Sequence, residues 1–250
     1  EQNNWFAASD NLVLKRFLNP AIENKKVPGV IGDFGFGIVN ETGRIDTLKL
    51  VKAYRNFLMD EKCIRFEKFE HLKLKVSKEK IRYEEIECKQ IVFCEGFGIK
   101  GNPFFKDLPL EEAKGELLTI HAPELNIDFL LKSALFLIPL GDNRYKVGAT
   151  FNHIDKTATP SEKGKLELVD KLKKVINVPY EIIDQTAGIR PTTNDRRPFI
   201  GQHKVHSRLS VLNGLGTRGV MLAPTMARSL FNSIEKDIAL DLEIDIKRFQ

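Results

Sequence analysis

The clearest pattern of apolar and polar positions lies late in the chain, where a strand, a glycine-rich loop and an amphipathic helix follow one another. Leu209, Val211 and Leu212 predict the strand. The glycines within residues 214–219 predict the loop, and residues 220–234 predict the helix. The apolar side of this helix includes Leu222, Met226, Leu230 and Ile234. This order points backbone amide groups at the carboxyl end of the strand.

Shorter elements are predicted in the first hundred residues. Residues 1–33 are expected to be irregular, because Pro and Gly interrupt a few apolar residues. Residues 34–39 predict a strand, and Asp46 is a suitable N-cap for the helix that follows. The apolar positions of that helix are Leu48, Val51, Tyr54 and Leu58. Four short strands are then expected within residues 63–69, 71–77, 80–86 and 89–95.

The middle of the chain has longer and more apolar strands. They are predicted within residues 115–122, 126–132, 134–141 and 145–151. The GDNR sequence between the last two has the composition of a hairpin turn. Thr159–Glu162 reads as a capping box with Pro160 at the first helical position, and a strand over 181–189 follows the helix. Periodicity alone therefore predicts a mixed α and β fold with a large antiparallel component.

Composition narrows the class of protein. With 250 residues, 42% hydrophobic and 29% charged, the chain is expected to be globular with one large or two smaller domains. No apolar run approaches the about 18 residues of a membrane span. The net charge of +5 could indicate nucleic acid, but the lysines are scattered and lack interleaved aromatic residues. We therefore predict no nucleic-acid partner.

The cysteines and histidines indicate no metal chemistry. Cys63, Cys88 and Cys94 are odd in number and lack CxxC spacing, so neither a disulfide framework nor a zinc site is expected. A reducing cytoplasm suits them best. The five histidines show no metal-ligand spacing and no recognisable nucleophile beside them; they are His71, His121, His153, His203 and His206.

Two glycine motifs could bind an anion. Uncapped amides at a helix start carry partial positive charge, and glycines allow close backbone approach. GLGTRG at residues 214–219 fits GxGxxG. A dinucleotide fingerprint, however, opens a βαβ unit and is followed by an acid about 20 residues further on. Here only a short segment follows the helix, so the loop is expected to end a nucleotide fold and not to begin one. GFGIKG at residues 96–101 follows a strand but runs into Pro103, which favours a turn.

A resemblance to a known family is carried by GIRPTTNDRRPFIG and the following NGLGTRGVMLAP. Together they resemble the closing signature of FAD-dependent amine oxidoreductases of the D-amino acid oxidase and glycine oxidase family. Residues 90–98 and 35–58 resemble two further family segments more loosely. The resemblance implies an FAD-binding Rossmann-like domain over 34–103 and 188–250, interleaved with an antiparallel substrate-binding sheet over 1–33 and 104–187.

One departure from the family pattern is large. The family begins with a strand, GxGxxG and a helix that hold the ADP pyrophosphate, whereas this sequence starts with EQNNWFAASD. A βαβ unit needs about 30 residues. We expect the sequence to be a fragment of a longer enzyme, with loss of the unit as the alternative. In either case, the 250 residues alone are expected to bind FAD poorly.

The resemblance also assigns candidate site residues. Arg190 would pair with a substrate carboxylate, since a guanidinium forms two parallel hydrogen bonds to it; the alternative is an arginine bonded to carbonyls of its own turn. Tyr145 and Thr150 would lie above the flavin, with hairpin packing as the alternative. The candidate flavin contacts are Gly96, Gly214, Gly216, Thr217, Arg218, Gly219, Val220 and Met221, against the alternative of a glycine turn that only packs helix on strand. The family prefers a small residue at the position of Glu95.

The expected activity follows from these assignments. The chain would contribute to an FAD-dependent oxidoreductase that oxidises the C–N bond of a small amino acid or amine by hydride transfer to flavin. The absence of an evident general base suits that reaction, which needs orientation more than side-chain proton transfer. The alternatives are a non-catalytic binding or assembly module that has lost flavin binding and, with less support, an oxidoreductase domain acting on modified RNA.

Overall fold

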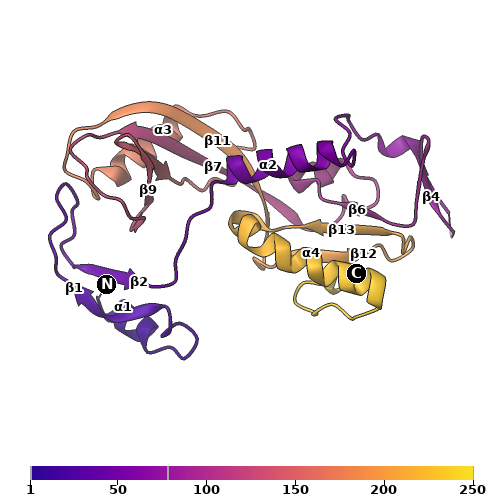
Figure 1. Cartoon of the computed structure of the whole chain (residues 1–250), viewed down its shortest axis with the longest axis horizontal. Helices are drawn as coiled ribbons and strands as arrows, with labels where there is room; N and C mark the ends of the chain where they lie inside the picture. The colour runs from indigo at the N-terminus through magenta and orange to yellow at the C-terminus, as the bar shows by residue number, and fades with distance from the viewer. Residues whose placement is uncertain (1, 78, 250) are drawn as a thin grey trace. The chain divides into compact units, whose positions relative to one another are not determined.

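The computed structural model describes residues 2–77 and 79–249 (Figure 1). Its contacts divide the chain into two compact units. Unit 1 comprises residues up to Leu50, Gly115–Phe151 and Ala158–Gly188, and unit 2 comprises Val51–Lys114, Asn152–Thr157 and residues from Ile189 onward. The chain thus passes between units several times, with residues 34–50 in unit 1 and residues 104–114 and 152–157 in unit 2.

Unit 1 is built on a five-stranded sheet with the strand order β11-β7-β10-β9-β8. The strands are β7 (Leu110–His121), β8 (Leu131–Lys132), β9 (Phe136–Gly141), β10 (Arg144–Gly148) and β11 (Glu181–Thr193), of which β7 and β11 continue into unit 2. Strand β10 pairs antiparallel with both β7 and β9. The predicted β9–β10 hairpin turn is present, with left-handed φ values of 50° at Asp142 and 54° at Asn143.

Helix α3 (Glu162–Leu172) completes the core of unit 1. Its buried Leu168 and Leu172 join an apolar cluster with sheet residues such as Leu118, Leu137 and Val147. The predicted helix is correct, but its N-cap is Ser161, whose hydroxyl accepts a hydrogen bond from the amide of Gly164 at 3.1 Å. The expected capping box at Thr159–Glu162 was therefore placed too early.

The start of the chain is more regular than the sequence predicts. The predicted strand over 34–39 is present as β2 (Phe36–Val39), but the residues before it form α1 (Gln2–Ser9) and β1 (Leu18–Glu23), which pairs antiparallel with β2. The prediction of irregular structure was wrong because tertiary contacts stabilise these short elements. The indole of Trp5 donates to the carbonyl of Asn19 at 2.9 Å, and a Cβ at Gly37 would lie only 2.5 Å from the Trp5 ring.

Unit 2 contains a three-stranded sheet with the order β12-β13-β6. Strands β12 (Phe199–Gln202) and β13 (Leu209–Asn213) are antiparallel, whereas β13 and β6 (Ile91–Phe93) are parallel. Helix α4 (Gly219–Lys236) lies against this sheet (Figure 1), and its Met226 and Leu230 pack against Ile200. A second cluster, which includes Phe93, Phe199 and Val211, forms another part of the core of the unit.

The remaining elements are short or solvent-exposed. A second three-stranded sheet is formed by β3 (Leu74–Val76), β4 (Ile81–Tyr83) and β5 (Ile86–Cys88). The strand expected over 63–69 is absent, since these residues form no sheet pairing. Helix α2 (Thr47–Asp60) begins after Asp46, as predicted, and the Asp46 carboxylate accepts from the amide of Lys49 at 3.0 Å.

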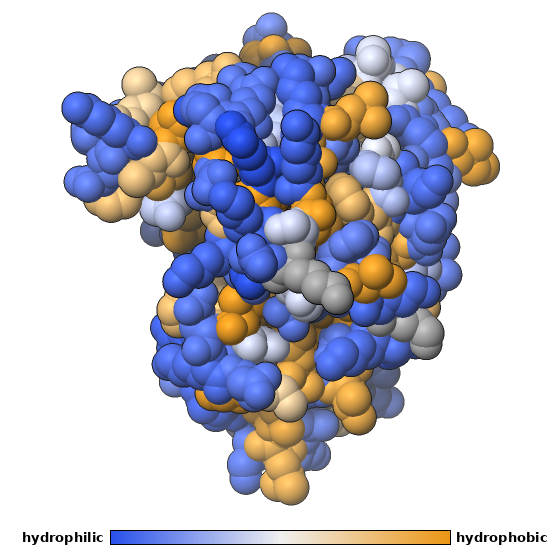
Figure 2. Space-filling view, turned by 90° about the vertical axis from the view of Figure 1, so that its right-hand side faces the viewer, coloured by the Kyte–Doolittle hydropathy of each residue, from blue (hydrophilic) through white to orange (hydrophobic). Residues whose placement is uncertain are grey.

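Four 3₁₀ turns complete the described secondary structure: η1 (His71–Lys73), η2 (Gly96–Gly101), η3 (Gly216–Arg218) and η4 (Ile246–Phe249). On the face drawn in Figure 2, hydrophilic residues cover most of the surface, with hydrophobic residues between them in small groups. No helix within residues 2–77 and 79–249 is long and apolar enough to cross a membrane.

Candidate functional site

The candidate site lies in unit 2, at the carboxyl ends of the parallel strands β6 and β13. Their register aligns Leu209 with Ile91 and Val211 with Phe93. Because parallel neighbours end at the same edge of a sheet, the segments that follow them leave from the same edge. These segments are the first glycine loop, residues 96–101, and the second glycine loop, residues 214–219. The structure therefore brings the two sequence motifs together.

The end of strand β11 lies against both glycine loops. A Cβ added at Gly96 would lie 4.0 Å from Pro191, and one at Gly216 would lie 3.7 Å from Thr192. At Gly214 an added Cβ would meet Thr193 at 2.8 Å, so only glycine fits there without movement of its neighbour. Arg190 immediately precedes these contact residues on the strand.

The Arg190 side chain is partly buried. Desolvation lowers the pKa of its guanidinium below the usual range for arginine. A guanidinium nevertheless remains protonated at neutral pH in proteins. The site thus contains a partly desolvated cation, Arg190. The residues that follow Arg190 on β11 contact both glycine loops.

The start of α4 presents backbone donors. Its N-cap position, Arg218, makes no side-chain capping hydrogen bond, so amides of the first turn lack this type of partner. Val220 and Met221 in that turn are 51% and 69% exposed. Gly214 and Gly216 have φ values of 71° and 58°, the left-handed conformation that glycine adopts without a Cβ penalty.

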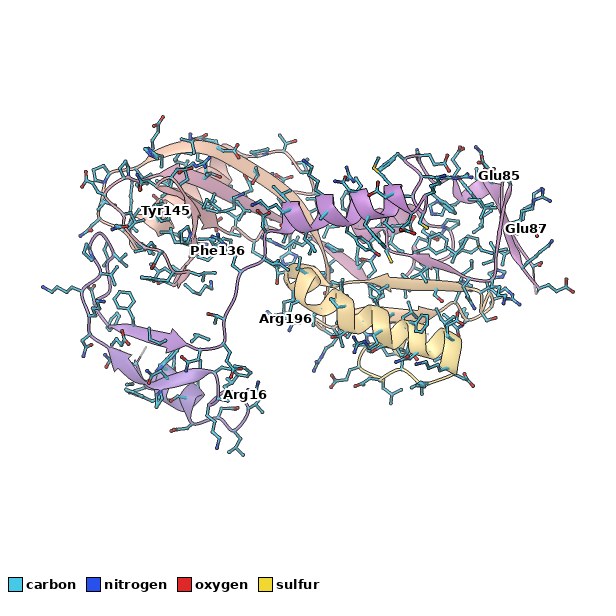
Figure 3. The ribbon with its side chains drawn as sticks, viewed as in Figure 1. Arg16, Glu85, Glu87, Phe136, Tyr145 and Arg196 are labelled. Atoms are coloured by element: carbon cyan, nitrogen blue, oxygen red, sulfur yellow. The ribbon has the colours of Figure 1, made fainter. Side chains whose placement is uncertain are left out.

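Arg218 has a structural contact of its own. Its guanidinium donates to the carbonyl of Arg196 at 2.9 Å (Arg196 is labelled in Figure 3). Arg196 has a left-handed φ of 56°, within the turn that connects β11 to β12. Arg218 therefore links the second glycine loop to this turn, and its predicted contact with a flavin stays a prediction.

Arg248, near the end of the described chain, holds the same turn. Its guanidinium donates to the carbonyls of Arg197 at 3.3 Å and Pro198 at 3.0 Å, and to the Asp195 carboxylate at 3.1 Å. Burial favours the neutral acid of Asp195, but hydrogen bonds from the Arg197 amide and Arg248 lower its pKa overall. Sequence reasoning missed Arg248, which belongs to no motif and lies fifty or more residues from the turn residues that it contacts.

The Glu95 carboxylate, beside the first glycine loop, is bonded to two side chains of unit 2. Its carboxylate lies 2.9 Å from Nε2 of His71 through one oxygen and accepts from Nδ2 of Asn102 at 2.7 Å through the other. Asn102 is fully buried and follows the last residue of that loop. The acid that occupies the family's small-residue position thus joins the two ends of the first glycine loop.

Tyr145 and Thr150 belong to the core of unit 1. Tyr145, which is labelled in Figure 3, is 4% exposed, and its hydroxyl donates to the carbonyl of Leu125. Thr150 is 3% exposed, and its hydroxyl accepts from the amide of Glu116 at 2.9 Å. These contacts are those of packing residues, and the predicted catalytic roles of both side chains gain no support from them.

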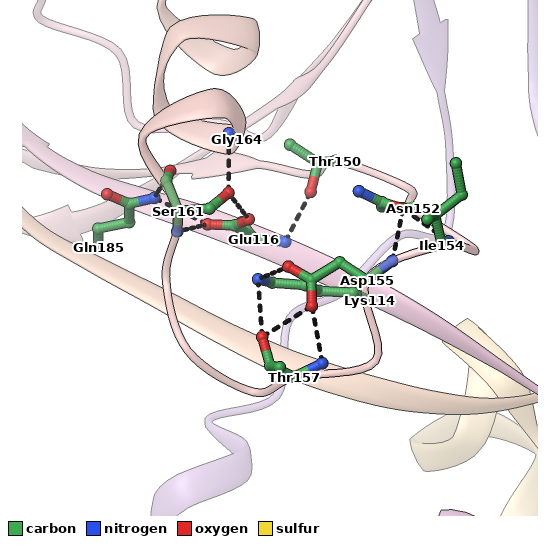
Figure 4. A network of polar contacts seen from close by, with 10 residues as sticks. All are labelled: Lys114, Glu116, Thr150, Asn152, Ile154, Asp155, Thr157, Ser161, Gly164 and Gln185. Carbon is green, nitrogen blue, oxygen red and sulfur yellow. Dashed lines mark hydrogen bonds and ion pairs between the residues drawn. The ribbon is translucent and has the colours of Figure 1, made fainter.

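A buried carboxylate organises the network around Thr150 (Figure 4). Glu116 is 3% exposed and accepts from the amide and hydroxyl of Ser161 at 2.8 and 2.6 Å and from Nε2 of Gln185 at 2.8 Å. Since Ser161 caps α3, this places a negative charge at the start of that helix, where the helix dipole favours it.

In unit 2, Lys114 forms the corresponding buried charge contact (Figure 4). Its ammonium group is 2.6 Å from the carboxylate of Asp155, and its side chain is 1% exposed. The hydrogen bond from Lys114, assisted by those from Thr157, lowers the pKa of Asp155 to about 2. Sequence reasoning did not single out Lys114 or Glu116.

One further pocket in unit 2, of about 490 Å³, has a mixed polar lining: Lys100, Leu110, Glu111, Glu112, His153 and Lys156. It borders the first glycine loop through Lys100. Among the described residues, no group of three or more His, Cys, Asp or Glu side chains could hold a metal ion.

Unit 2 has parallel strands that end in two glycine loops and a helix start without a side-chain cap, and unit 1 is built on an antiparallel sheet. These features are typical of an α/β protein that binds a cofactor and has a separate sheet domain. A profile of the FAD dependent oxidoreductase (DAO) family matches residues 1–232. The chain belongs to this family. This confirms the resemblance drawn from the sequence, the fold class, and FAD as the cofactor of the family.

Curated relatives include glycine oxidases. Glycine oxidase of Bacillus subtilis (strain 168) is 28% identical over 215 residues, which cover 80% of this chain and 57% of the relative. A second kind of relative is the tRNA 5-methylaminomethyl-2-thiouridine biosynthesis bifunctional protein MnmC of Azoarcus sp. (strain BH72), which is 25% identical over 181 residues that cover 64% of this chain and 28% of the relative. The chain therefore spans less than two thirds of the length of these relatives.

Solved structures show the same fold. Glycine oxidase from Geobacillus kaustophilus has a TM-score of 0.69 at 20% identity, covering 86% of this chain and 60% of that chain. L-proline dehydrogenase from P. horikoshii has a TM-score of 0.68 at 16% identity, covering 85% and 62%. Iminodiacetate oxidase from Chelativorans sp. BNC1 has a TM-score of 0.62 at 19% identity, covering 86% and 59%.

The residues of unit 2 fit the cofactor of this family. At Gly101 no atom lies within 4 Å of an added Cβ, so the first glycine loop is open at this point, and at Gly98 an added Cβ would make only an ordinary contact with Glu95, at 3.8 Å. The first turn of α4 adds amide donors without side-chain caps. Both features suit a ligand with anionic groups and a polar ring edge.

Proposed function

We propose that the protein containing this chain is an FAD-dependent oxidoreductase that oxidises the C–N bond of a small amino acid or amine, by hydride transfer to flavin. The observation that carries the proposal is the convergence, within unit 2, of both glycine loops with the strand end that bears Arg190. Glycine oxidase and iminodiacetate oxidase among the similar proteins support an amino-acid-like substrate. A cytoplasmic location is part of the proposal.

The chain's residues would contribute binding and orientation. Bound FAD supplies the hydride acceptor, whose ring gains negative charge on reduction. Amides of residues 216–221 would hold the polar edge of that ring, because preorganised donors stabilise charge that develops during the reaction. Arg190 would bind a substrate carboxylate through two hydrogen bonds and so orient the neighbouring C–N bond.

Replacement of Arg190 by lysine tests the substrate assignment. In the flavin-containing protein, Arg190→Lys is expected to raise KM for a carboxylated amine at least about tenfold, because an ammonium cannot form the two parallel hydrogen bonds. KM for an amine without a carboxylate should change little. Arg228→Lys, at an exposed position of α4, is the matched control. An unchanged KM for the carboxylated amine would remove Arg190 from the substrate site.

The cofactor itself gives a separate test. The purified full-length protein should be yellow and show flavin absorbance that is bleached by its substrate under anaerobic conditions. A colourless protein that takes up no added FAD would instead support the alternative of a non-catalytic binding or assembly module.

A second candidate substrate is a modified tRNA base. It is favoured by the similarity to MnmC proteins and by the net charge of +5. If it is correct, the protein should bind tRNA with an affinity that falls steeply with salt, since phosphate contacts release counterions. Oxidation of a free amino acid without measurable tRNA binding would favour the first candidate and the predicted absence of a nucleic-acid partner.

A further inference from the structure

Asn213 connects the two glycine loops directly. It is the last residue of β13, and its Nδ2 donates to the carbonyl of Gly96 at 2.7 Å. Its Oδ1 accepts from the amide of Gly214 at 2.8 Å. One side chain therefore holds the first residue of each loop, although Asn213 and Gly96 are 117 residues apart in sequence.

The environment of Asn213 makes this link selective for an amide. The residue is 3% exposed, so a group that fails to form its hydrogen bonds is left without water as a substitute partner. Gly96 and Gly214 both have left-handed φ values, 57° and 71°. Sheet pairing does not reach these two turns, because β6 ends at Phe93 and β13 ends at Asn213. The hydrogen bonds of Asn213 therefore hold both turns.

A second buried asparagine has a local role only. Asn102 bonds to Glu95, and its Oδ1 accepts from the amide of Phe104 at 2.9 Å. These contacts connect the two ends of the first glycine loop and do not reach the second. Asn102 thus provides a natural comparison for Asn213, with similar burial and the same chemical group.

We propose that Asn213 is a positioning residue that couples the two glycine loops, so that their amides are presented to the cofactor as one preorganised surface. The inference deepens the proposed function and rests on it for the identity of the cofactor. Preorganisation lowers the cost of ordering the loops upon binding. Loss of the link is therefore expected to weaken FAD binding even though Asn213 itself need not touch FAD.

Asn213→Asp tests the link with minimal change in shape. The ionised carboxylate can still accept from Gly214, but it cannot donate to Gly96 and would face that carbonyl. We expect the dissociation constant of FAD, measured by flavin fluorescence in the full-length protein at neutral pH, to rise roughly tenfold. Asn56→Asp, an exposed site on α2 with the same charge change, should leave it within about twofold.

Lowering the pH should partly rescue this variant. A protonated aspartic acid has the donor that asparagine has, and burial beside a carbonyl raises the pKa of a carboxyl group. The affinity of Asn213→Asp for FAD should therefore approach that of the wild type as the pH falls from 8 to about 5.5. A pH-independent deficit would contradict the hydrogen-bond explanation and would leave Asn213 with a general structural role.

Hydrogen exchange in the absence of FAD tests the coupling independently of cofactor binding. Asn213→Asp should speed amide exchange in both glycine loops, residues 96–101 and 214–219, whereas Asn102→Ala should do so only in the first. Faster exchange confined to the second loop in Asn213→Asp would overturn the proposal. Should this variant fail to fold, Asn213→Ser, which is uncharged and too short to reach Gly96, is expected to give the same exchange pattern.

The outcomes also separate this inference from the proposed function. If the wild-type protein binds no FAD but exchange shows coupled loops, the cofactor assignment fails and the link stands. If FAD binds with equal affinity to the wild type and to Asn213→Asp, the link has no role in binding, and the proposed function is unaffected.

Discussion

Helix α3 of unit 1 and helix α4 of unit 2 begin in opposite ways. Helix α3 in unit 1 is capped by Ser161, and the buried Glu116 carboxylate bonds to that same residue. Helix α4 in unit 2 begins at glycine, with no side-chain cap at Arg218. In unit 1 the chain supplies its own anion at a helix start, whereas in unit 2 no side chain caps the start of α4, which follows the second glycine loop.

This difference indicates how the two units divide their roles. In unit 1, the buried polar side chains Glu116, Thr150 and Tyr145 bond to other groups of the same unit. In unit 2, the backbone donors of α4 and the partly buried cation of Arg190 lie on segments that meet at one sheet edge. In unit 1 these polar side chains support the fold, and the groups that we propose for binding the cofactor and its substrate lie in unit 2.

The largest expected effect comes from removal of the internal anion of unit 1. Glu116→Ala would remove the acceptor of the amide and hydroxyl of Ser161 and one of the two acceptors of the Gln185 side-chain amide. The expected loss of unfolding free energy is about 3 kcal/mol, because each partly buried donor that loses its acceptor is costly. Urea denaturation should show it, with Glu124→Ala, at an exposed site of unit 1, as the control.

Retention of stability in Glu116→Ala would mean that water or rearrangement replaces the carboxylate. The contrast between the two helix starts would then lose its energetic basis, because α3 would be stable without its anion just as α4 is.

A smaller, pH-dependent effect is expected for Lys114→Met in unit 2. Lys114 lowers the pKa of Asp155 to about 2, from the ordinary value of 3.8. A carboxylate with a lowered pKa stabilises the fold above its ordinary pKa, and this contribution is lost as the pH falls through the folded value. Any stability advantage of the wild type over Lys114→Met should therefore be largest above about pH 4 and shrink towards pH 2.

The effect should be smaller than that of Glu116→Ala because the Asp155 side chain is 33% exposed and can be hydrated when its partner is removed. Thermal unfolding of both proteins between pH 2 and 6 would measure it. A stability difference that does not change over this range would show that Lys114 acts through packing of its aliphatic chain.

The comparison also shows which features the sequence could predict. The strand, glycine loop and helix from Leu209 to Lys236 were predictable because local spacing and glycine chemistry specify them. The same holds for the β9–β10 turn and for Asp46 as an N-cap. The start of the chain was not predictable, since α1 has little amphipathic pattern and depends on contacts of Trp5 with residues on β1 and β2.

The residues of the candidate site also fall into those that the sequence could predict and those that it could not. Arg190 and the glycine loops were found because they lie in short motifs that resemble a family signature. Asn213, Arg248 and Glu116 were not found, because their partners are far away in sequence and each residue type is unremarkable in isolation. Such contacts arise only when segments that are distant in sequence come together in the folded chain.

The smallest expected effect concerns Tyr145, which the family resemblance suggested as a catalytic residue. Its hydroxyl donates to the Leu125 carbonyl inside the core of unit 1. Tyr145→Phe should therefore cost about 1 kcal/mol of unfolding free energy, the usual value of one hydrogen bond, and leave kcat and KM within about twofold. A fall in kcat of tenfold or more, with unfolding unchanged, would instead assign the hydroxyl to catalysis and contradict the division of roles between the units.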